Sequence, residues 1–397
     1  MIGVAVLNVA AAVPDSTWVQ LRPLPGQGRV ALFALAVDPA NNQIVVAANS
    51  QGSLLRTTNG GGAWTTVHSA TVTVNTIAFN PNVAGLVLAG TRGGGALASK
   101  DGGATWAAVG GLDGRNVRVF GFALNLVVAG TDHGVYTSAD GLSWTQSGLT
   151  SPSISAIAVE AIHEPVHLLA GSDAPASGGT LSMWLSVDGG ASWKRTSPAI
   201  SGTMTLELVS GPLPPVGNVR PLLAGTNTGL FTSNDNGVSF NPLSGGGLLP
   251  TTDYTKVAFL TSHHDRFYVA SDGGGSGSGG LWRSNDGGQT FASLRPPQSA
   301  VTALAVSNDE LPTLYVATFQ PSTHAVSLWS YHDTFAAPVG PPTTPSPLAS
   351  AARLHRASDA GLFGFLASPL LPYIALGVGA LAIVLTAIAA HLRGRYR

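Results

Sequence analysis

The chain has 397 residues, of which only 10% are charged, and it contains 50 glycines and no cysteine. Its formal net charge of −1 gives no argument for nucleic-acid binding, and we expect no nucleic-acid partner. The lack of cysteine excludes disulfides, thiolate metal sites and cysteine nucleophiles.

Residues 1–15 are an apolar leader. Ile2–Val13 ends in Ala-Ala-Ala-Val-Pro, like the apolar core and small-residue cleavage site of a signal peptide, although no basic residue precedes it. We expect a truncated signal peptide, and the alternative is a leading segment without that role. Thr17–Leu21 then reads as an outer β-strand with no sheet in front of it.

Within residues 16–335 one phrase recurs: Ser/Thr-x-Asp/Asn, one to three glycines, and a closing aromatic residue. Asp or Asn starts a turn by bonding its own backbone, and the following Gly accepts a positive φ. We expect the aromatic ring to pack between neighbouring sheets. The acid or amide and the aromatic residue of the six copies are Asn59 and Trp64, Asp101 and Trp106, Asp140 and Trp144, Asp188 and Trp193, Asp235 and Phe240, and Asp286 and Phe291.

The copies recur roughly every 40–50 residues, a period typical of a propeller built from four-stranded blades. The first inner strand is predicted at Leu32–Val37. A seventh unit, with strands at Val301–Val306, Thr313–Thr318 and Val326–Tyr331, has no outer strand, and Tyr331-His332-Asp333 is at most a decayed copy of the phrase. The strand at Thr17–Leu21 fits that vacancy. We therefore predict a single all-β propeller of seven blades closed by the N-terminal strand, with six blades as the alternative.

The phrase resembles the Asp-box, or BNR repeat, of sialidases, sortilin-type receptors, xyloglucanases and photosystem II assembly factors. The resemblance covers roughly residues 18–335 and implies the fold, while this range of relatives leaves the function open. The arginine triad and the Tyr/Glu pair that a sialidase needs cannot be matched. The chain has only four glutamates, at positions 160, 164, 207 and 310. We therefore assign no catalytic, cofactor or metal residue.

Three motifs invite a catalytic interpretation that their surroundings oppose. His163-Glu164-Pro165-Val166-His167 matches the zinc motif H-E-x-x-H, but that motif needs a helix, and the flanking residues predict a hairpin. His263-His264-Asp265 is predicted to be the corresponding turn of the sixth blade. Gly273–Gly280 lacks the lysine and the helix of a phosphate-binding loop, so we interpret it as a flexible loop.

A weaker pattern marks one face of the propeller. The second strand of most blades ends in Ala-Gly-Thr/Ser or Ala-Ser and is followed by a polar residue. These turns share a face with the connections between blades, opposite the repeated phrase. Polar turn residues often do no more than face water, but any ligand surface is expected here. The residues are Arg92, Asp132, His133, Asp173, Asn227 and Asp272.

The C-terminal part indicates a membrane anchor. Residues 336–370 are a Pro-rich linker and juxtamembrane segment, and Leu371–Leu392 is apolar and long enough to span a bilayer. The basic tail 393–397 predicts a cytoplasmic C-terminus and an extracytoplasmic propeller. We thus expect a single-pass, surface-exposed propeller that acts as a non-enzymatic binding or assembly module for a protein or a glycan. The alternative is a sialidase-like glycoside hydrolase.

Overall fold

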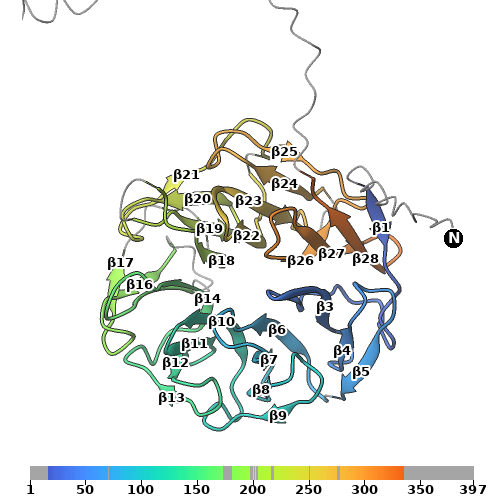
Figure 1. Ribbon diagram of the computed structural model, residues 1–397. Coiled ribbons are helices and arrows are strands. Elements are labelled where there is room, and N and C mark those ends of the chain that lie inside the picture. Colours follow the sequence, from blue (N-terminus) through green and yellow to red (C-terminus); the bar gives the residue numbers. More distant parts are fainter. Residues whose placement is uncertain are drawn as a thin grey trace, which may run out of the picture. The chain divides into compact units, whose positions relative to one another are not determined.

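The computed structural model describes residues 17–334 except 70, 173–180, 197–199, 201, 203, 216–218, 250 and 275–277. Seven four-stranded antiparallel sheets, the blades, stand in a ring (Figure 1). The predicted seven-bladed propeller is thereby confirmed. Within the described ranges no helix is long and apolar enough to cross a bilayer. The predicted leader, linker, spanning segment 371–392 and basic tail lie outside these ranges.

Each blade runs outward from the centre of the ring, and first strands of neighbouring blades contact one another. The first strands are β2 (Leu35–Asp38), β6 (Val74–Phe79), β10 (Val117–Ala123), β14 (Ile154–Glu160), β18 (Thr205–Ser210), β22 (Lys256–Leu260) and β26 (Val301–Val306). The second strands are β3 (Asn41–Ala48), β7 (Val87–Thr91), β11 (Leu126–Thr131), β15 (His167–Ser172), β19 (Leu222–Thr226), β23 (His263–Ser271) and β27 (Thr313–Gln320).

The outer half of each blade is shorter. The third strands are β4 (Leu54–Thr57), β8 (Ala96–Ser99), β12 (Gly134–Ser138), β16 (Met183–Ser186), β20 (Gly229–Ser233), β24 (Gly280–Ser284) and β28 (Ala325–His332). The outermost strands are β5 (Thr65–His68), β9 (Ala107–Ala108), β13 (Thr145–Gln146), β17 (Lys194–Thr196), β21 (Asn241–Pro242), β25 (Ala292–Ser293) and, in the seventh blade, β1 (Trp18–Gln20).

The N-terminal strand closes the ring, as predicted. β1 pairs antiparallel with β28, and Trp18 lies opposite Tyr331. The two rings have centroids 4.8 Å apart, and the Trp18 indole N–H donates to the Leu294 carbonyl of the sixth blade at 2.9 Å. One aromatic residue therefore joins the first strand of the chain to its last two blades.

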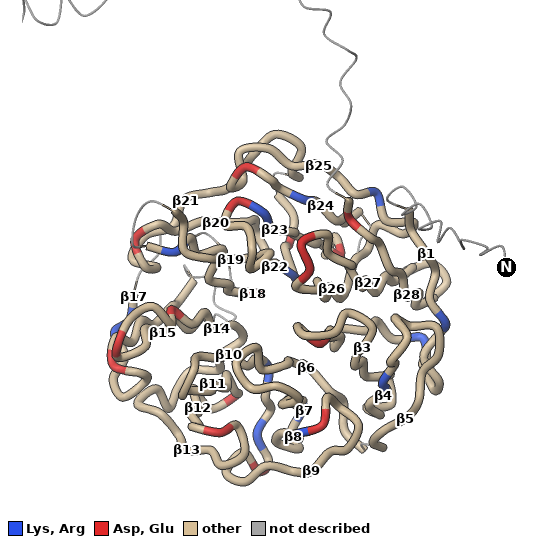
Figure 2. The backbone as a smooth tube through the Cα atoms, in the orientation of Figure 1, with Lys and Arg blue, Asp and Glu red and all other residues tan. Residues whose placement is uncertain are grey.

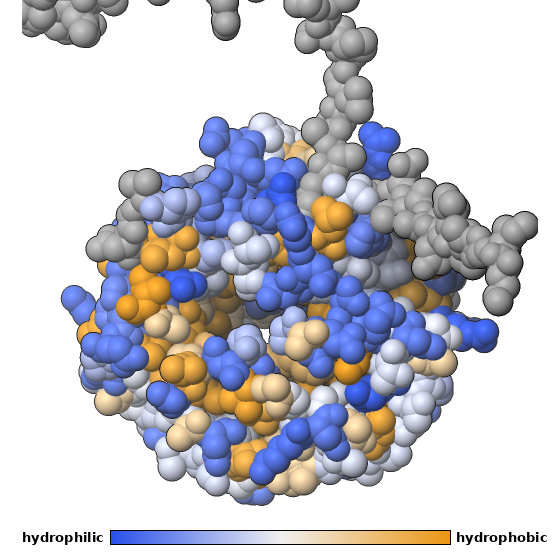
Figure 3. Space-filling view, viewed as in Figure 1, coloured by the Kyte–Doolittle hydropathy of each residue, from blue (hydrophilic) through white to orange (hydrophobic). Residues whose placement is uncertain are grey.

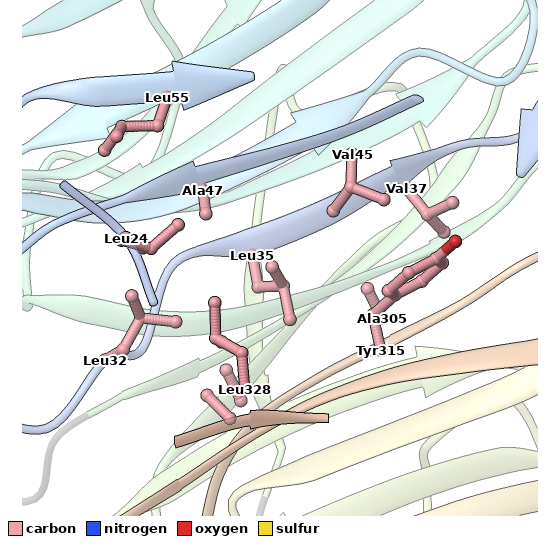
Figure 4. Packing of buried hydrophobic residues seen from close by; sticks show 12 residues of the cluster. Leu24, Leu32, Leu35, Val37, Val45, Ala47, Leu55, Ala305, Tyr315 and Leu328 are labelled. Carbon is pink, nitrogen blue, oxygen red and sulfur yellow. The ribbon is translucent and has the colours of Figure 1, made fainter. Parts of the chain in front are cut away.

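The apolar core is divided into seven clusters, one at each junction between blades. Figure 4 shows the junction of the seventh and first blades, where Leu35 and Val45 lie near Tyr315. Every cluster includes one aromatic residue that begins, or directly precedes, an outermost strand. These are Trp18, Trp64, Trp106, Trp144, Trp193, Phe240 and Phe291.

The repeated phrase forms a hydrogen-bonded turn, here called the repeated turn, between the third and outermost strands. In the second blade, Ser99 Oγ donates to Asp101 Oδ1 at 2.7 Å. The Thr105 N–H and hydroxyl donate to the two oxygens of Asp101 at 2.8 and 2.6 Å. The Trp106 indole N–H donates to the Gly103 carbonyl at 3.0 Å. Gly103 has a φ of +84°, which explains the glycine at this position.

The Asp101 carboxylate gives a first prediction. The Thr105 hydroxyl bond is the main cause that lowers the pKa of Asp101 to about 2. A lowered pKa stabilises the fold above the unfolded value of 3.8, and this contribution is lost as the pH falls toward 2. Because the group is exposed and screened by solvent, we expect Asp101→Ala to cost only about 1 kcal/mol at pH 7.

Urea unfolding at pH 7 and at pH 2.5 checks this. The difference in the free energy of unfolding between wild type and Asp101→Ala should be smaller at pH 2.5 than at pH 7. Asp101→Asn is the matched control, because Asn59 already accepts the Ala63 N–H at 2.9 Å in the first blade. A difference that is independent of pH would contradict the assignment.

The seventh blade lacks the repeated turn but retains its acid. Tyr331 lies opposite Leu314, as Ser284 lies opposite Phe267 in the sixth blade, so Asp333 occupies the position of the turn aspartate. Asp333 is fully buried, and it accepts from Arg283 Nη1 at 2.5 Å and from the Tyr268 hydroxyl at 2.9 Å. Here the acid joins the seventh blade to the sixth instead of stabilising a turn.

The strand order separates two faces. The repeat face carries the repeated turns and the hairpins between first and second strands. The loop face carries the turns between second and third strands and the connections between blades. Charged residues of both signs are scattered sparsely around the ring (Figure 2), so any local group of like charges stands out.

Candidate functional site

The predicted ligand residues within the described ranges all lie on turns of the loop face. Arg92 follows β7, Asp132 and His133 link β11 to β12, Asn227 follows β19, and Asp272 follows β23. Asp173 lies outside the described residues. The ring is hollowed at its centre, with apolar surface beside the hollow over β10 and β11 (Figure 3).

A cavity of about 850 Å³ opens among the fifth, sixth and seventh blades. Asn227 and Asp272 line it, as do Asp253 and Lys256 at the start of the sixth blade. Its apolar wall includes Leu249, which is partly exposed. The cavity therefore combines charged groups of both signs with aliphatic surface.

Hydrogen bonds hold the walls of this cavity in place. The buried Tyr254 hydroxyl donates to the Leu249 carbonyl at 2.8 Å, and burial raises the pKa of Tyr254 far above its ordinary value, so it remains a donor. Asp253 Oδ1 accepts from Ser271 Oγ at 3.0 Å. Lys256 Nζ pairs with Glu207 Oε2 at 3.2 Å.

A second cavity of about 530 Å³ lies at the first, second and third blades. Arg92 and Arg118 supply its charge, and Asn75 and Asn116 add amide side chains to its lining. Asn75 Nδ2 donates to Asn116 Oδ1 at 2.7 Å and to the Val117 carbonyl at 3.0 Å, which fixes the wall between the second and third blades.

Phe33 lines both cavities, so they meet at this residue. Phe33 is 51% exposed, although its neighbours Leu32 and Ala34 are buried. The Thr302 hydroxyl of the seventh blade donates to the Leu32 carbonyl at 2.7 Å. An aromatic side chain is thus held in solvent by a backbone segment that is anchored on both sides.

Asp132 and His133 line neither cavity. Asp132 Oδ1 accepts the Asn116 N–H at 3.1 Å, and its other oxygen lies 3.3 Å from His133 Nδ1. The Asp132 carboxylate therefore fastens a turn of the third blade to the connection that precedes that blade. The structure brings Asn227 and Asp272 together and places Arg92 in the neighbouring cavity.

Four further residues line these cavities that the turn pattern in the sequence does not predict: Phe33, Arg118, Asp253 and Lys256. That pattern covers only turns after second strands, whereas these four residues lie in blade connections or first strands. Phe33 was placed inside the strand Leu32–Val37, but the strand begins at Leu35. The sequence offers one signal for Phe33. It lies between two aliphatic residues, Leu32 and Ala34, which are buried in the structure.

The H-E-x-x-H motif lies in a hairpin, as predicted. β14 and β15 pair antiparallel, and Glu160 lies opposite His167. The rings of His163 and His167 stack with centroids 4.0 Å apart. Among the described residues, no group of three or more His, Asp or Glu side chains could hold a metal ion. His263–Asp265, predicted as a turn, instead opens strand β23, because the turn lies at residues 261–262.

Glu160, beside this hairpin, carries a pH prediction. It is buried, and its Oε1 accepts from Ser210 Oγ of the fifth blade at 2.5 Å. Burial raises the pKa of Glu160, while Ser210, Arg220 and His163 oppose the rise. A raised acid pKa stabilises the fold below the unfolded value of 4.5, and that contribution is lost as the pH rises through the folded pKa.

We expect Glu160→Gln, which mimics the protonated acid, to unfold at higher urea concentration than wild type above this pKa. The gain should disappear at pH 4. Glu164→Gln in the same hairpin is the matched control. A gain of equal size at both pH values would contradict the prediction.

Neither a protein-family profile nor a curated protein matches the chain. Among solved structures, YCF48 from Cyanidioschyzon merolae is similar, with 15% identity and a TM-score of 0.55 over 79% of this chain and 98% of that one. YCF48 bound to D1 peptide has 16% identity and a TM-score of 0.54 over 81% and 96%.

The GH74 xyloglucanase from Xanthomonas campestris is also similar, with 16% identity and a TM-score of 0.54 over 79% of this chain. The present chain spans only 55% of that enzyme's length. These similarities show the seven-bladed propeller fold and, at such identities, nothing finer.

Proposed function

We propose that the loop face binds an extended segment of a partner protein at the two cavities that meet at Phe33. The main support for this proposal is the exposed residue Phe33, which lies between buried neighbours where the two cavities meet. Rigid aromatic residues supply much of the binding energy at protein interfaces, because little conformational entropy is lost when they are covered.

The lining supports a protein segment over a glycan. Leu206 and Leu249 extend apolar surface from Phe33, and charged groups lie on both sides. Such a surface suits alternating apolar and charged side chains. The solved structure of YCF48 bound to D1 peptide gives further support, because in it a propeller of similar fold binds a peptide.

A display library of 12-residue peptides, selected on the purified protein, tests the proposal. Phe33→Ala should weaken the selected peptides at least about tenfold, the usual scale for an aromatic anchor. Leu124→Ala is the control, because Leu124 is 74% exposed on the repeat face. Failure to select peptides, or peptides that bind Phe33→Ala as well as wild type, would overturn the proposal.

A glycoside hydrolase is the second candidate. Asp253 and Asp272 line the same cavity, and glycosidases use a pair of carboxylates. Turnover of fluorogenic sialosides or glucosides that is lost in both Asp253→Asn and Asp272→Asn would favour the enzyme.

The membrane anchor is part of the proposal and rests on Leu371–Leu392 and the arginines that follow. Protease added to intact cells should release a soluble fragment of roughly residues 15–345 by cutting the Pro-rich linker. A propeller that stays protected until the membrane is broken would reverse the orientation.

A further inference from the structure

We infer that Leu206 is a second apolar anchor for the partner segment, which places one apolar side chain on Phe33 and another on Leu206. This inference rests on the proposed function and names the kind of side chain that one part of the site accepts. Phe33 and Leu206 both line the 850 Å³ cavity, although they belong to the first and fifth blades. The two residues hold the same position in their blades, and that position is polar in the others.

The first strands of five blades contain a β-bulge near the loop face. In the second blade, Val74 lies opposite Thr91 and Thr76 lies opposite Gly90, so Asn75 is an extra residue. The extra residues of the third, fourth, fifth and seventh blades are Arg118, Ser155, Leu206 and Thr302. A bulge re-aims a side chain, and bulges are common next to functional sites. The place of the extra residue is here called the bulge position.

Polar side chains at the bulge position fasten one blade to the next. Asn75 Nδ2 of the second blade donates to the Val117 carbonyl of the third blade at 3.0 Å. Ser155 Oγ of the fourth blade donates to the Thr205 carbonyl of the fifth blade at 2.7 Å. Each accepting carbonyl belongs to the residue directly before the bulge position of its own blade. This bond, here called the blade clamp, therefore recurs in the ring.

The blade clamp also identifies the bulge position of the first blade. The Thr302 hydroxyl of the seventh blade donates to the Leu32 carbonyl, so Phe33 directly follows a clamped residue, as Leu206 does. The Ala48 N–H donates to the Ala34 carbonyl at 3.1 Å, which ties the next residue to the second strand. The backbone ahead of Phe33 and of Leu206 is therefore fixed by the same kind of bond.

The fifth blade cannot clamp the sixth, because the Leu206 side chain has no hydrogen-bond donor. The acceptor at this junction would be the carbonyl of Tyr254, which packs against Gly225 of the fifth blade as Val117 packs against Gly90 of the second. The 850 Å³ cavity opens where this clamp is replaced by an aliphatic side chain.

Only two of the seven bulge positions are apolar. Thr255, which follows Tyr254, completes the set in the sixth blade. In blade order the residues are Phe33, Asn75, Arg118, Ser155, Leu206, Thr255 and Thr302. Departures from a repeated local rule are expected mainly at functional sites. That both departures line one cavity points to a common ligand.

The surroundings of Leu206 are suited to an apolar side chain. Leu206 is half-buried, and Leu249 adds a more exposed aliphatic side chain to the same cavity. The Tyr254 N–H donates to the Thr226 carbonyl at 2.9 Å, and its hydroxyl donates to the Leu249 carbonyl. This wall is thus held in place without the blade clamp, and covering a prearranged surface costs little conformational entropy.

A double-mutant cycle between protein and ligand tests the inference. The probes are 12-residue peptides selected on the wild-type protein, with each apolar residue replaced in turn by alanine. Fluorescence anisotropy measures their affinities for the full chain in neutral detergent. Leu206→Ala should weaken the parent peptides about tenfold, the scale for uncovering a leucine side chain. One apolar peptide residue should lose its contribution in Leu206→Ala and keep it in Phe33→Ala, and another should do the reverse.

Leu206→Ser separates the apolar contact from the spacing of the blades. Serine at this position should donate to the Tyr254 carbonyl, as Ser155 does to the Thr205 carbonyl. Leu206→Ser should therefore unfold at a higher urea concentration than Leu206→Ala and bind the peptides as weakly. Met204→Ala is the control and should leave their affinity unchanged, because Met204 is exposed in the same segment but is not among the residues that line the cavity.

The inference is overturned if no peptide residue couples to Leu206, or if Leu206→Ser binds the peptides as tightly as wild type. Peptides that need Phe33 but are indifferent to Leu206 would leave the proposed function standing alone. Failure to select peptides, or peptides that do not need Phe33, would overturn the inference and the proposed function together.

Discussion

Asp333→Ala is expected to destabilise the protein by about 3–5 kcal/mol, because it removes the carboxylate that pairs with the buried, charged Arg283 guanidinium. Both oxygens of Asp333 are used, by Arg283 Nη1 and by the Tyr268 hydroxyl. Burial and the nearby acid raise the pKa of Tyr268 far above its ordinary value, so the hydroxyl stays a donor. The loss should appear as a lower midpoint in urea unfolding.

The double variant Arg283→Met/Asp333→Leu distinguishes the cost of breaking the ion pair from the cost of lacking it altogether. Replacing a buried ion pair by apolar residues often costs little, so the double variant should be more stable than Asp333→Ala. Asp113→Ala, an exposed acid, is the control for loss of one carboxylate. Wild-type stability of Asp333→Ala would show that the pair contributes nothing.

Trp144→Ala is expected to cost about 3–5 kcal/mol, the range for deletion of a buried aromatic side chain. Trp144 is 5% exposed and lies in the cluster between the second and third blades, with its ring 5.9 Å from that of Phe120. Its indole N–H donates to the Gly141 carbonyl at 3.0 Å. Thermal and urea unfolding would measure the loss.

Trp193→Ala is the matched comparison, because Trp193 makes the same bond to Gly190 at 3.0 Å but is only partly buried. It should lose less stability than Trp144→Ala. Trp144→Phe should recover most of the packing energy. Equal losses at positions 144 and 193 would mean that burial is not the cause.

The propeller could be predicted because its repeat is local. Ser99, Asp101 and Thr105 bond one another within a single turn, so their spacing in the sequence predicts the geometry without knowledge of the fold. The closing strand could be predicted for a related reason. An unpaired Trp18 segment and a seventh unit without an outer strand each need a partner.

The candidate site could be predicted only in part because it depends on residues distant in the sequence. Phe33 and Thr302 line one cavity although they come from the first and last parts of the propeller sequence, and only ring closure brings them together. The role of Asp132 also depends on a neighbour, since its carboxylate bonds the Asn116 N–H. Turn sequences alone do not distinguish a side chain that faces a cavity from one that fastens a loop.

The pairing of β1 with β28 sets a minimum time before the propeller can close during synthesis. Trp18 and Tyr331 are separated by most of the propeller sequence, so the ring cannot close until translation has passed Tyr331. At about 5–20 residues per second, this interval is roughly 15–60 s. During it, the first blade exposes Leu35, Val45 and Leu55, which later pack against the seventh blade. Nascent chains are therefore most exposed to aggregation, and most dependent on chaperones, before the last blade is made.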